Sequence, residues 1–458
     1  MNANNARLQL ASKIGISPLI IVPHYFSMKG GDFVKNNVLS TLFVGIDVSS
    51  KTNVLCALDF QGNKLLNLKA LNNQPGAESI LDNILDCLNS NSLKYVVIAL
   101  ESTSFYSTHI ANFLASNELL LAYNPLVFCL NPKSIANYRK SFVDMDKTDP
   151  LDAYIIADFA RCGRVTSEPW RGAQFLALQR LSRHRLHLVE CITREKAYMV
   201  SNIYLKFSEL AVLDKDERPF SNTYGVTSAA VLTDFLSLDE ITYSSIEDLV
   251  AFVSDKGKNR FSDPYETAKL LQKAARDSYR LDKVLYEPLN TAIASSFNVI
   301  KAFDDEIKTI DKAIAKAVKG LNTTEYQSLT SIPGIGPVLA SGILAEIGTI
   351  TSFNSHNALA KYAGLTWRTK QSGSYSADDT RMTKTGNKYL RYYLIEAANS
   401  VKNNIPEYRD FYRKKYGEVT THQHKRALAL TSRKLVRLIF GLLTKNQIYS
   451  SDKVGEIQ

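Results

Sequence analysis

The spacing of apolar and polar residues divides this 458-residue chain into a first part with strand-like runs and a later part with helical rhythm. In the first part, the apolar runs at 41–46 and 95–100 contain β-branched and aromatic residues in succession without a helical period, which indicates buried strands. Strands expected at 53–60 and 64–71 flank a Gln-Gly-Asn turn at 61–63. This pair predicts a β-hairpin.

Helices and strands alternate after the hairpin. The pattern predicts a helix over 78–88, the 95–100 strand, a helix over 106–115, a strand over 119–123, and a closing helix from Asp152 to Arg161. A strand meander followed by alternating helix and strand is the order expected of an RNase H-like α/β domain.

The middle of the chain is predicted to be helical. Residues 176–210 show a helical pattern, and apolar side chains then recur at three- and four-residue steps at Ile293, Phe297, Ile300, Phe303, Ile307, Ile310, Ile314 and Ala317. This rhythm predicts a coiled-coil seam or a long bundle helix. Its partner is either the 176–210 helix or another subunit, so we expect self-association. Residues 211–275, with several turn signals, are interpreted as an insertion without an assigned function.

A tight turn is predicted near Ser331, where Ile332-Pro-Gly-Ile-Gly336 precedes a helical apolar run. Two glycines in a turn before a helix let backbone N–H groups approach a phosphate, as in helix-hairpin-helix DNA-binding elements. Pro-Gly and Gly-Pro pairs also make ordinary connections between helices, so local sequence leaves both interpretations open.

The length of the chain predicts more than one hydrophobic core. At this size we expect two or three domains. The expected organisation is a poorly ordered leader at 1–40, an α/β domain at 41–165, a helical region at 166–320 that contains the insertion, and a mostly helical domain at 321–458.

Charge is concentrated in the last of these domains. The chain has a net charge of +10, and residues 321–458 hold 19 lysines and arginines against 10 aspartates and glutamates. A basic domain favours a polyanionic partner, and nucleic acid more than a membrane because no long apolar span is present; a merely soluble charged surface is the alternative. The five cysteines, odd in number and without CxxC spacing, are interpreted as reduced core residues of a cytoplasmic protein.

Four carboxylates form the most informative candidate site. Asp47 ends the first predicted strand, Glu101 closes the later one, and Asp149 and Asp152 lie three residues apart where a helix begins, on one helix face. Gathered carboxylates repel one another unless a cation lies between them, and hard oxygen ligands suit Mg²⁺ or Mn²⁺. A pair of such ions supports phosphodiester chemistry. Each carboxylate alone is better explained as a turn former or a helix cap, so the hypothesis rests on all four together.

Basic residues surround a polar loop in the C-terminal domain. Those that can line a phosphate path are Arg368, Lys370, Arg381, Lys384 and Lys388, with Trp367 and Tyr375 available for stacking. Judged locally, Ser372 in this loop is a turn residue. Periodicity gives no reason to single it out.

Together these motifs resemble those of the DEDD-type insertion-sequence transposases (the IS one-ten family), which includes the Piv/MooV site-specific invertases. The resemblance covers residues 41–161 and 325–445. It rests on Gly45-Ile-Asp47, Glu101-Ser-Thr, Lys147-Thr-Asp149-Pro-Leu-Asp152-Ala, Ile332-Pro-Gly-Ile-Gly336, Ala363-Gly-Leu, Ser372-Gly373 and Arg381-Met-Thr-Lys384-Thr-Gly386.

The resemblance implies roles for these residues. It makes Asp47, Glu101, Asp149 and Asp152 the catalytic and metal-binding carboxylates of a RuvC-like domain and Ser372 the nucleophile. It further implies Mg²⁺ or Mn²⁺, donor and target DNA, a structured non-coding guide RNA, and a homo-oligomer, dimer or tetramer, in which the metal site of one subunit faces the serine of another. We therefore expect an RNA-guided DNA recombinase of a bacterial or archaeal mobile element, nucleoid-associated in the cytoplasm and without a membrane partner.

The chain also departs from the family pattern. The leader and the 211–275 segment add length, and Ser-Thr-Ser follows Glu101 where the family has Ala-Thr-Gly. No catalytic carboxylate or serine is missing, so we expect an active protein. Three alternatives stay open: a Piv-type invertase with the same active site, a domesticated nucleic-acid-binding protein that no longer cuts, and a junction-resolving nuclease.

Overall fold

The computed structural model describes residues 37–102, 104–142, 148–165, 169–214, 216–321, 324–367, 371–372, 375–376 and 382–450. Most of the predicted leader, and the basic residues Arg368, Lys370 and Arg381, lie outside the described residues. The chain forms two compact units. The sheet unit comprises residues 1–173 and 348–354, and the helical unit comprises residues 174–347 and 355–458.

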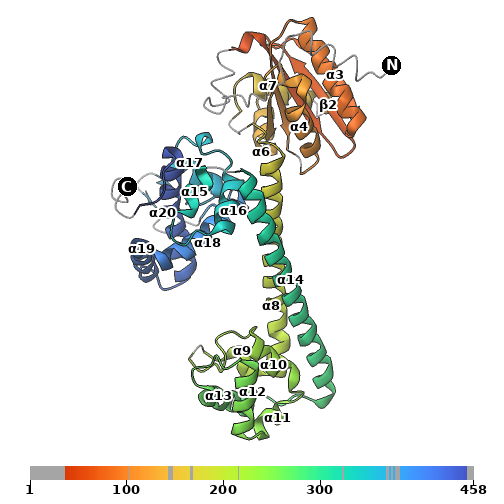
Figure 1. Cartoon of the computed structure of the whole chain (residues 1–458). Helices are drawn as coiled ribbons and strands as arrows, with labels where there is room; N and C mark the ends of the chain where they lie inside the picture. Colours follow the sequence, from red (N-terminus) through yellow and green to blue (C-terminus); the bar gives the residue numbers. More distant parts are fainter. Residues whose placement is uncertain are drawn as a thin grey trace. The chain divides into compact units, whose positions relative to one another are not determined.

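The sheet unit contains a five-stranded mixed sheet with the strand order β3-β2-β1-β4-β5 (Figure 1). The antiparallel neighbours are β1 (Thr41–Val48), β2 (Thr52–Leu58) and β3 (Lys64–Leu71). The strands β4 (Tyr95–Glu101) and β5 (Leu126–Leu130) run parallel to β1. The helices of the unit are α3 (Gln74–Ser90), α4 (Ser107–Ser116), α5 (Glu118–Leu121), α6 (Pro132–Arg139) and α7 (Asp149–Arg161).

The predicted strands and helices of this unit are confirmed, except that the strand predicted at 119–123 is wrong. The side chain of Asn117 accepts a hydrogen bond from the backbone N–H of Leu119 and begins the one-turn helix α5. The strand follows only after Asn124, whose φ is 48°. An asparagine N-cap therefore outweighs the strand propensity of the apolar run. The sequence pattern also does not predict α6, which Asn131 caps in the same way.

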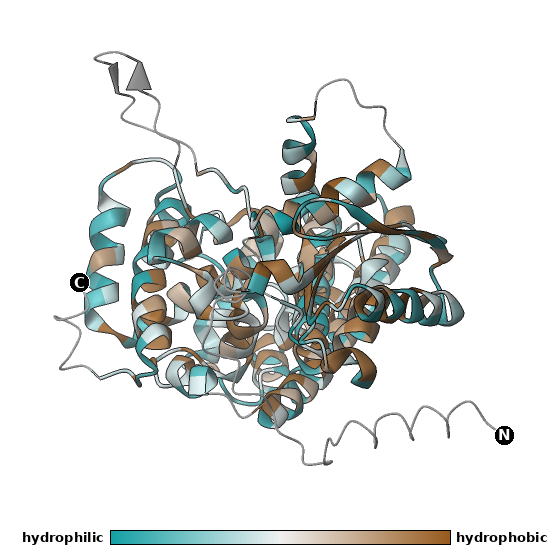
Figure 2. Ribbon diagram, turned by 90° about the horizontal axis from the view of Figure 1, so that it is seen from above, coloured by the Kyte–Doolittle hydropathy of each residue, from teal (hydrophilic) through white to brown (hydrophobic). Residues whose placement is uncertain are grey.

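Helices cover both faces of the sheet, which explains the uninterrupted apolar runs in its strands. On one face, α3 and α4 pack against the side chains of Val44, Ile46, Ile98 and Leu100. On the other face, α7 packs against those of Phe43, Val97 and Ala99. The strands are accordingly brown, the hydrophobic end of the scale, in Figure 2. Because side chains alternate along a strand, the odd-numbered residues of β1 and β4 face α7.

Helix α7 approaches the sheet most closely at Gly45 in β1. A Cβ atom built on Gly45 lies 2.2 Å from the carbonyl oxygen of Ala153 and 2.3 Å from the amide nitrogen of Ala157. Both are backbone atoms of α7, so no side-chain rotation can relieve the contact. The glycine therefore lets α7 lie directly on β1.

The helical unit is built on two long helices, α8 (Ala173–Lys206) and α14 (Tyr286–Leu321), which run side by side in opposite directions (Figure 1). Near the start of α8, Leu178 packs with Ile314, whereas near its end Ile203 packs in one cluster with Ile293. The apolar stripe of α14 therefore packs against the chain's own α8. Self-association stays a prediction.

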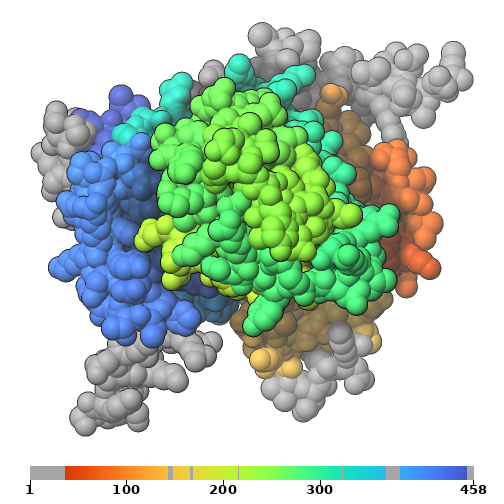
Figure 3. Space-filling model, turned by 90° about the horizontal axis from the view of Figure 1, so that it is seen from below, coloured from red at the N-terminus to blue at the C-terminus, as the bar shows by residue number. Residues whose placement is uncertain are grey.

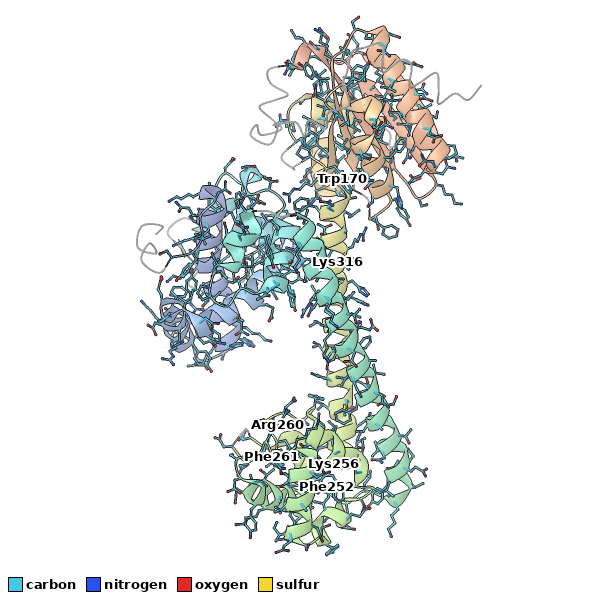
Figure 4. The ribbon with its side chains drawn as sticks, in the orientation of Figure 1. Trp170, Phe252, Lys256, Arg260, Phe261 and Lys316 are labelled. Carbon is cyan, nitrogen blue, oxygen red and sulfur yellow. The ribbon has the colours of Figure 1, made fainter. Side chains whose placement is uncertain are left out.

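Short helices connect α8 to α14 and occupy most of the segment interpreted as an insertion. They are α9 (Ser208–Val212), α10 (Val226–Asp234), α11 (Leu238–Tyr243), α12 (Ile246–Lys256) and α13 (Pro264–Asp277); Figure 3 looks onto their surface, drawn in green. Lys256, labelled in Figure 4, pairs with Asp234 at 2.8 Å. The buried Lys206 donates to the carbonyl oxygen of Leu232 at 2.7 Å, and burial lowers its pKa to about 8.

The rest of the helical unit is the C-terminal group of helices. They are α15 (Thr324–Thr330), α16 (Pro337–Ile347), α17 (His356–Ala363), α18 (Lys388–Asn404), α19 (Pro406–Gly417) and α20 (Gln423–Lys445). The predicted turn near Ser331 joins α15 to α16 and places Gly334 at φ 98°. Within the described part of the chain, no helix is long and apolar enough to cross a membrane. The prediction that every cysteine is a core residue is wrong for Cys162, which is exposed after the end of α7.

Replacing Gly45 with alanine is expected to lower the free energy of unfolding of the sheet unit by about 1–3 kcal/mol, because the new Cβ pushes α7 off β1. Native-state hydrogen exchange of the β1 and β4 amides measures this locally. The control is Gly320→Ala in α14, where no atom lies within 4 Å of the added Cβ; we expect it to be neutral or stabilising by about 0.5–1 kcal/mol. Equal protection of the β1 amides in the two variants would contradict the packing described above.

Candidate active site

Asp47 and Glu101 end two neighbouring parallel strands. Ile46 of β1 is paired with Leu100 of β4, so the next residue on each strand is a carboxylate. Both side chains are half-buried. The structure thus brings these two predicted site residues to the same edge of the sheet.

Both carboxylates belong to the face that α7 covers. Asp47 lies two residues after Gly45, which touches α7, and Glu101 lies two residues after Ala99, which packs in the same cluster as Ile155 of α7. Residues two apart on a strand share a face. The start of α7 therefore lies on the face to which Asp47 and Glu101 belong.

Asp149 is the first residue of α7 and is exposed. It lines an open pocket of about 280 Å³ together with Val54, Lys69 and Pro150. Val54 is the cross-strand partner of Asp47, so the pocket lies beside Asp47. A carboxylate at this position also interacts favourably with the N-terminal end of the helix dipole. The arrangement is open enough for a ligand to reach Asp149.

Asp152, one turn further along α7, is buried and forms an ion pair with Arg139, the last residue of α6. The guanidinium of Arg139 places a positive charge beside this carboxylate. Among the residues that the structure describes, no three His, Cys, Asp or Glu side chains are close enough to hold a metal ion. The structure therefore brings Asp47, Glu101 and the start of α7 to one edge but does not form a complete ligand cluster there.

The loop that carries Ser372 begins and ends at a short antiparallel contact. Trp367 pairs with Met382, and the hydroxyls of Thr366 and Thr383 are 3.1 Å apart. Between these ends, β6 (Gln371–Ser372) and β7 (Tyr375–Ser376) form a two-stranded ladder with Ser372 opposite Tyr375. Ser372 is therefore part of a hairpin.

Two glycines of the family-like motifs make the packing at the base of this loop possible. Gly364 ends α17 at φ 70°, and Gly386 has φ 138°. A Cβ on Gly386 would lie 2.3 Å from the carbonyl oxygen of Tyr362. Of the predicted phosphate-binding lysines, Lys384 has φ 51° and Lys388 is the first residue of α18.

A buried carboxylate links the residues at the base of this loop to α8. The side chain of Glu346 in α16 is fully buried and accepts two hydrogen bonds from Arg183 of α8, at 2.7 and 2.9 Å, and one from Asn387 at 2.7 Å. Asn387 in turn accepts hydrogen bonds from the first amides of α18. Burial alone lowers the pKa of Arg183, but the hydrogen bonds and charge of Glu346 raise it above its ordinary value. Arg183 therefore stays charged beside Glu346.

Sequence reasoning missed the residues of this network and Arg139. Glu346 carries a signal that could have revealed it, because it is the only charged residue in the apolar helix α16. Arg183 and Arg139 carry none, since each lies among other polar residues and finds its partner only in the folded chain.

Comparison with known families gives two matches. Residues 44–205 match the DEDD transposase model of IS110, and residues 326–413 match the model described as the transposase IS116/IS110/IS902 family. The first range contains the four candidate carboxylates and the second contains Ser372.

Individual relatives agree with these matches. The insertion element IS116 uncharacterized 44.8 kDa protein of Streptomyces clavuligerus is 22% identical over 413 residues, 89% of this chain and 96% of the relative. The mini-circle putative transposase for IS117 of Streptomyces coelicolor is 23% identical and covers 73% of this chain and 78% of its own. The pilin gene-inverting protein of Moraxella lacunata is 28% identical over 151 residues, 32% of this chain and 46% of the relative. The chain carries both domains of the IS110/IS116/IS902 family and belongs to that family of transposases.

Proposed function

We propose that this transposase cuts and rejoins DNA with a metal site formed by Asp47, Glu101, Asp149 and Asp152 and with Ser372 as the nucleophile. The observation that carries the proposal is the position of Asp47 and Glu101 at the ends of paired parallel strands, on the face that the start of α7 covers. Carboxylates held this near one another repel and are stable together only with a positive charge between them.

The topology of the sheet supports an RNase H-like, RuvC-like domain at 41–165. Three antiparallel strands are followed by two parallel ones, with the carboxylates on β1, β4 and the last helix. In the same proposal, α8 and α14 form a coiled coil within 166–320, and α15 and α16 form a helix-hairpin-helix-like element in the domain at 321–458. The glycine turn between α15 and α16 supports that last assignment.

Mg²⁺ or Mn²⁺ suits the proposed donor set, because four carboxylates supply hard oxygen ligands. The ion pair between Arg139 and Asp152 supports the proposal, because it indicates that a positive charge at this edge is stabilising. Bound by the four carboxylates, the metal would polarise a phosphate and stabilise charge on a leaving oxygen. Arg139 would then release Asp152.

Ser372 attacks the scissile phosphate in the proposed reaction. The bond from its Oγ to phosphorus forms, the bond from phosphorus to the leaving sugar oxygen breaks, the hydroxyl loses its proton and the sugar oxygen gains one. An ester replaces an ester, so no external energy source is needed. Arg368, Lys370, Arg381, Lys384 and Lys388 would hold the strand and its negative charge.

The proposed partners are donor and target DNA, a structured non-coding guide RNA and further copies of this chain, as a dimer or tetramer. The basic C-terminal domain supports a polyanionic partner. Such a protein would act at the nucleoid of a bacterial or archaeal cytoplasm. A Piv-type invertase is the second candidate, which the similarity to the pilin gene-inverting protein favours. Inversion of a segment between inverted repeats, without a flanking RNA, would separate the two.

Removing the competing guanidinium is expected to tighten metal binding. The Arg139→Gln protein, without nucleic acid, should bind Mn²⁺ at least about tenfold more tightly than wild type, because Asp152 no longer has an internal cation. Isothermal titration calorimetry measures the affinity. Arg161→Gln is the matched control, since Arg161 pairs with Asp158 in the same helix away from the site. Equal Mn²⁺ affinities in both variants would rule out Arg139 as a competitor.

Deleting the buried carboxylate should loosen the base of the serine hairpin. Glu346→Ala leaves Arg183 without its partner and is expected to cost about 3 kcal/mol, at the low end for a broken buried pair because Arg183 is partly exposed. The control Asp305→Ala breaks the exposed pair with Lys308, which solvent screens, and should leave stability and exchange close to wild type. Hydrogen exchange at Tyr389 and Leu390, whose amides Asn387 caps, reports the local effect. Unchanged protection there would contradict the anchoring role.

Recombination in cells tests the proposed chemistry. A plasmid donor carrying the element's flanking non-coding DNA should give product with wild type but none with Ser372→Ala or Asp149→Ala, because the first removes the nucleophile and the second a metal ligand. Product should also be lost when the flanking sequence is deleted.

The control for the serine variant is Ser376→Ala, which changes the same hairpin on the opposite strand. It should recombine like wild type within a few fold. Recombination by Ser372→Ala would place the nucleophile elsewhere, and only the metal-dependent half of the proposal would survive.

A further inference from the structure

Helix α20 presents two very different faces. Residues such as Leu435, Ile439 and Leu442 are buried in the C-terminal group of helices. The 23-residue helix also contains six lysines and arginines and no aspartate or glutamate. The polar positions of this helix are therefore strongly basic.

Other elements balance only part of this charge. Arg426 pairs with Glu418 at 3.1 Å, and Lys434 pairs with Glu407 at 2.5 Å. Within the described part of the chain, Arg433 and Arg437 form no ion pair with a carboxylate. They lie four residues apart, and so on the same side of the helix, about 6 Å apart along its axis.

Neutral groups hold Arg433 in place. It donates hydrogen bonds to the side-chain oxygen of Asn357 and, at 3.3 Å, to Nδ1 of His356, both at the start of α17, which packs against α20 (Figure 1). A guanidinium only donates, so Nδ1 accepts and His356 is neutral. The His356 ring also stands edge-on to Phe440, with 6.5 Å between ring centroids. Arg433 is thus fixed and partly buried without a counter-charge.

The basic groups weaken one another's ionisation. Burial, followed by the charges of Arg433 and Arg437, lowers the pKa of His356. Burial and the charge of Arg437 likewise lower the pKa of Arg433. An anion between them would reverse both effects, because it would stabilise the charged forms.

We propose that His356, Arg433 and Arg437 form a binding site for the phosphodiester backbone of a nucleic acid, separate from the loop that carries Ser372. Arginine presents paired N–H donors that match phosphate oxygens, and the two unbalanced cations one turn apart in the middle of α20 are both arginines. Because Nδ1 of His356 accepts from Arg433, the ring carries its proton on Nε2, which is a third donor. The site rests on the nucleic-acid substrate of the proposed function but on neither Ser372 nor the carboxylates.

The test uses full-length protein carrying Ser372→Ala, so that binding is measured without reaction. Fluorescence anisotropy gives the affinity for a labelled DNA duplex and for a labelled single-stranded RNA between about 50 and 200 mM KCl. Over this range of salt, a few phosphate contacts change the affinity by about one decade. Arg433→Gln/Arg437→Gln should weaken binding at least about tenfold. The salt slope should fall by about 1.8 for duplex or about 1.4 for single strands, the loss of two phosphate contacts.

A double variant of the paired residues, Arg426→Gln/Lys434→Gln, is the matched control, because it removes the same charge from the same helix. It should bind within about twofold of its parent with an unchanged slope. Arg437→Gln alone is a second variant that should not disturb folding, since Arg437 is exposed. Its salt slope should fall by about half as much as that of the double variant.

A smaller salt slope in Arg433→Gln/Arg437→Gln than in its parent supports the site. Whether the slope falls with DNA, with RNA or with both identifies the nucleic acid that binds there. An unchanged slope with both ligands, or an equal loss in the control variant, would overturn it. The outcome is independent of the proposed catalysis. Binding through this site by a protein that never recombines would leave the inference standing and remove the proposed function.

Discussion

The contact between α7 and β1 at Gly45 is the constraint on which the candidate metal site depends. Because no side chain separates the helix from the strand, the carboxylates at the start of α7 come to the face that Asp47 and Glu101 share. The same closeness concentrates negative charge, which is unfavourable without a cation. In the chain alone, Arg139 supplies one positive charge to Asp152. Packing at Gly45 therefore positions the start of α7, and Arg139 pairs with one of the two carboxylates there.

Much of the sheet unit could be predicted, because its central strands β1 and β4 are buried on both faces and almost entirely apolar. Asp47 and Glu101 were predictable as strand ends, but their pairing depends on register, which local pattern does not contain. The strand predicted at 119–123 is wrong because a single Asn117 cap decides the local structure. Arg139 was beyond prediction, since its partner is chosen by tertiary packing and not by spacing.

The C-terminal half was predictable as helices but not as a site. Nothing in the local sequence distinguishes Ser372 from an ordinary turn residue, and only the resemblance to a family singles it out. What the structure adds is the network next to the hairpin: Arg183 donates to the buried Glu346, and Asn387 links this pair to the first turn of α18. A buried ion pair contributes little net stability compared with apolar packing. Its value here is geometric, since it fixes the position of the helix that follows the serine hairpin.

Net charge predicted the class of partner but not where that partner binds. Folding pairs some cations of α20 with carboxylates from neighbouring elements and leaves Arg433 and Arg437 unbalanced. In the sheet unit, Arg139 pairs with the single carboxylate of Asp152. At α20 the chain holds two like charges that no carboxylate of the described residues pairs with. In the two proposals, a cation completes the carboxylate site and a phosphate completes the site at α20.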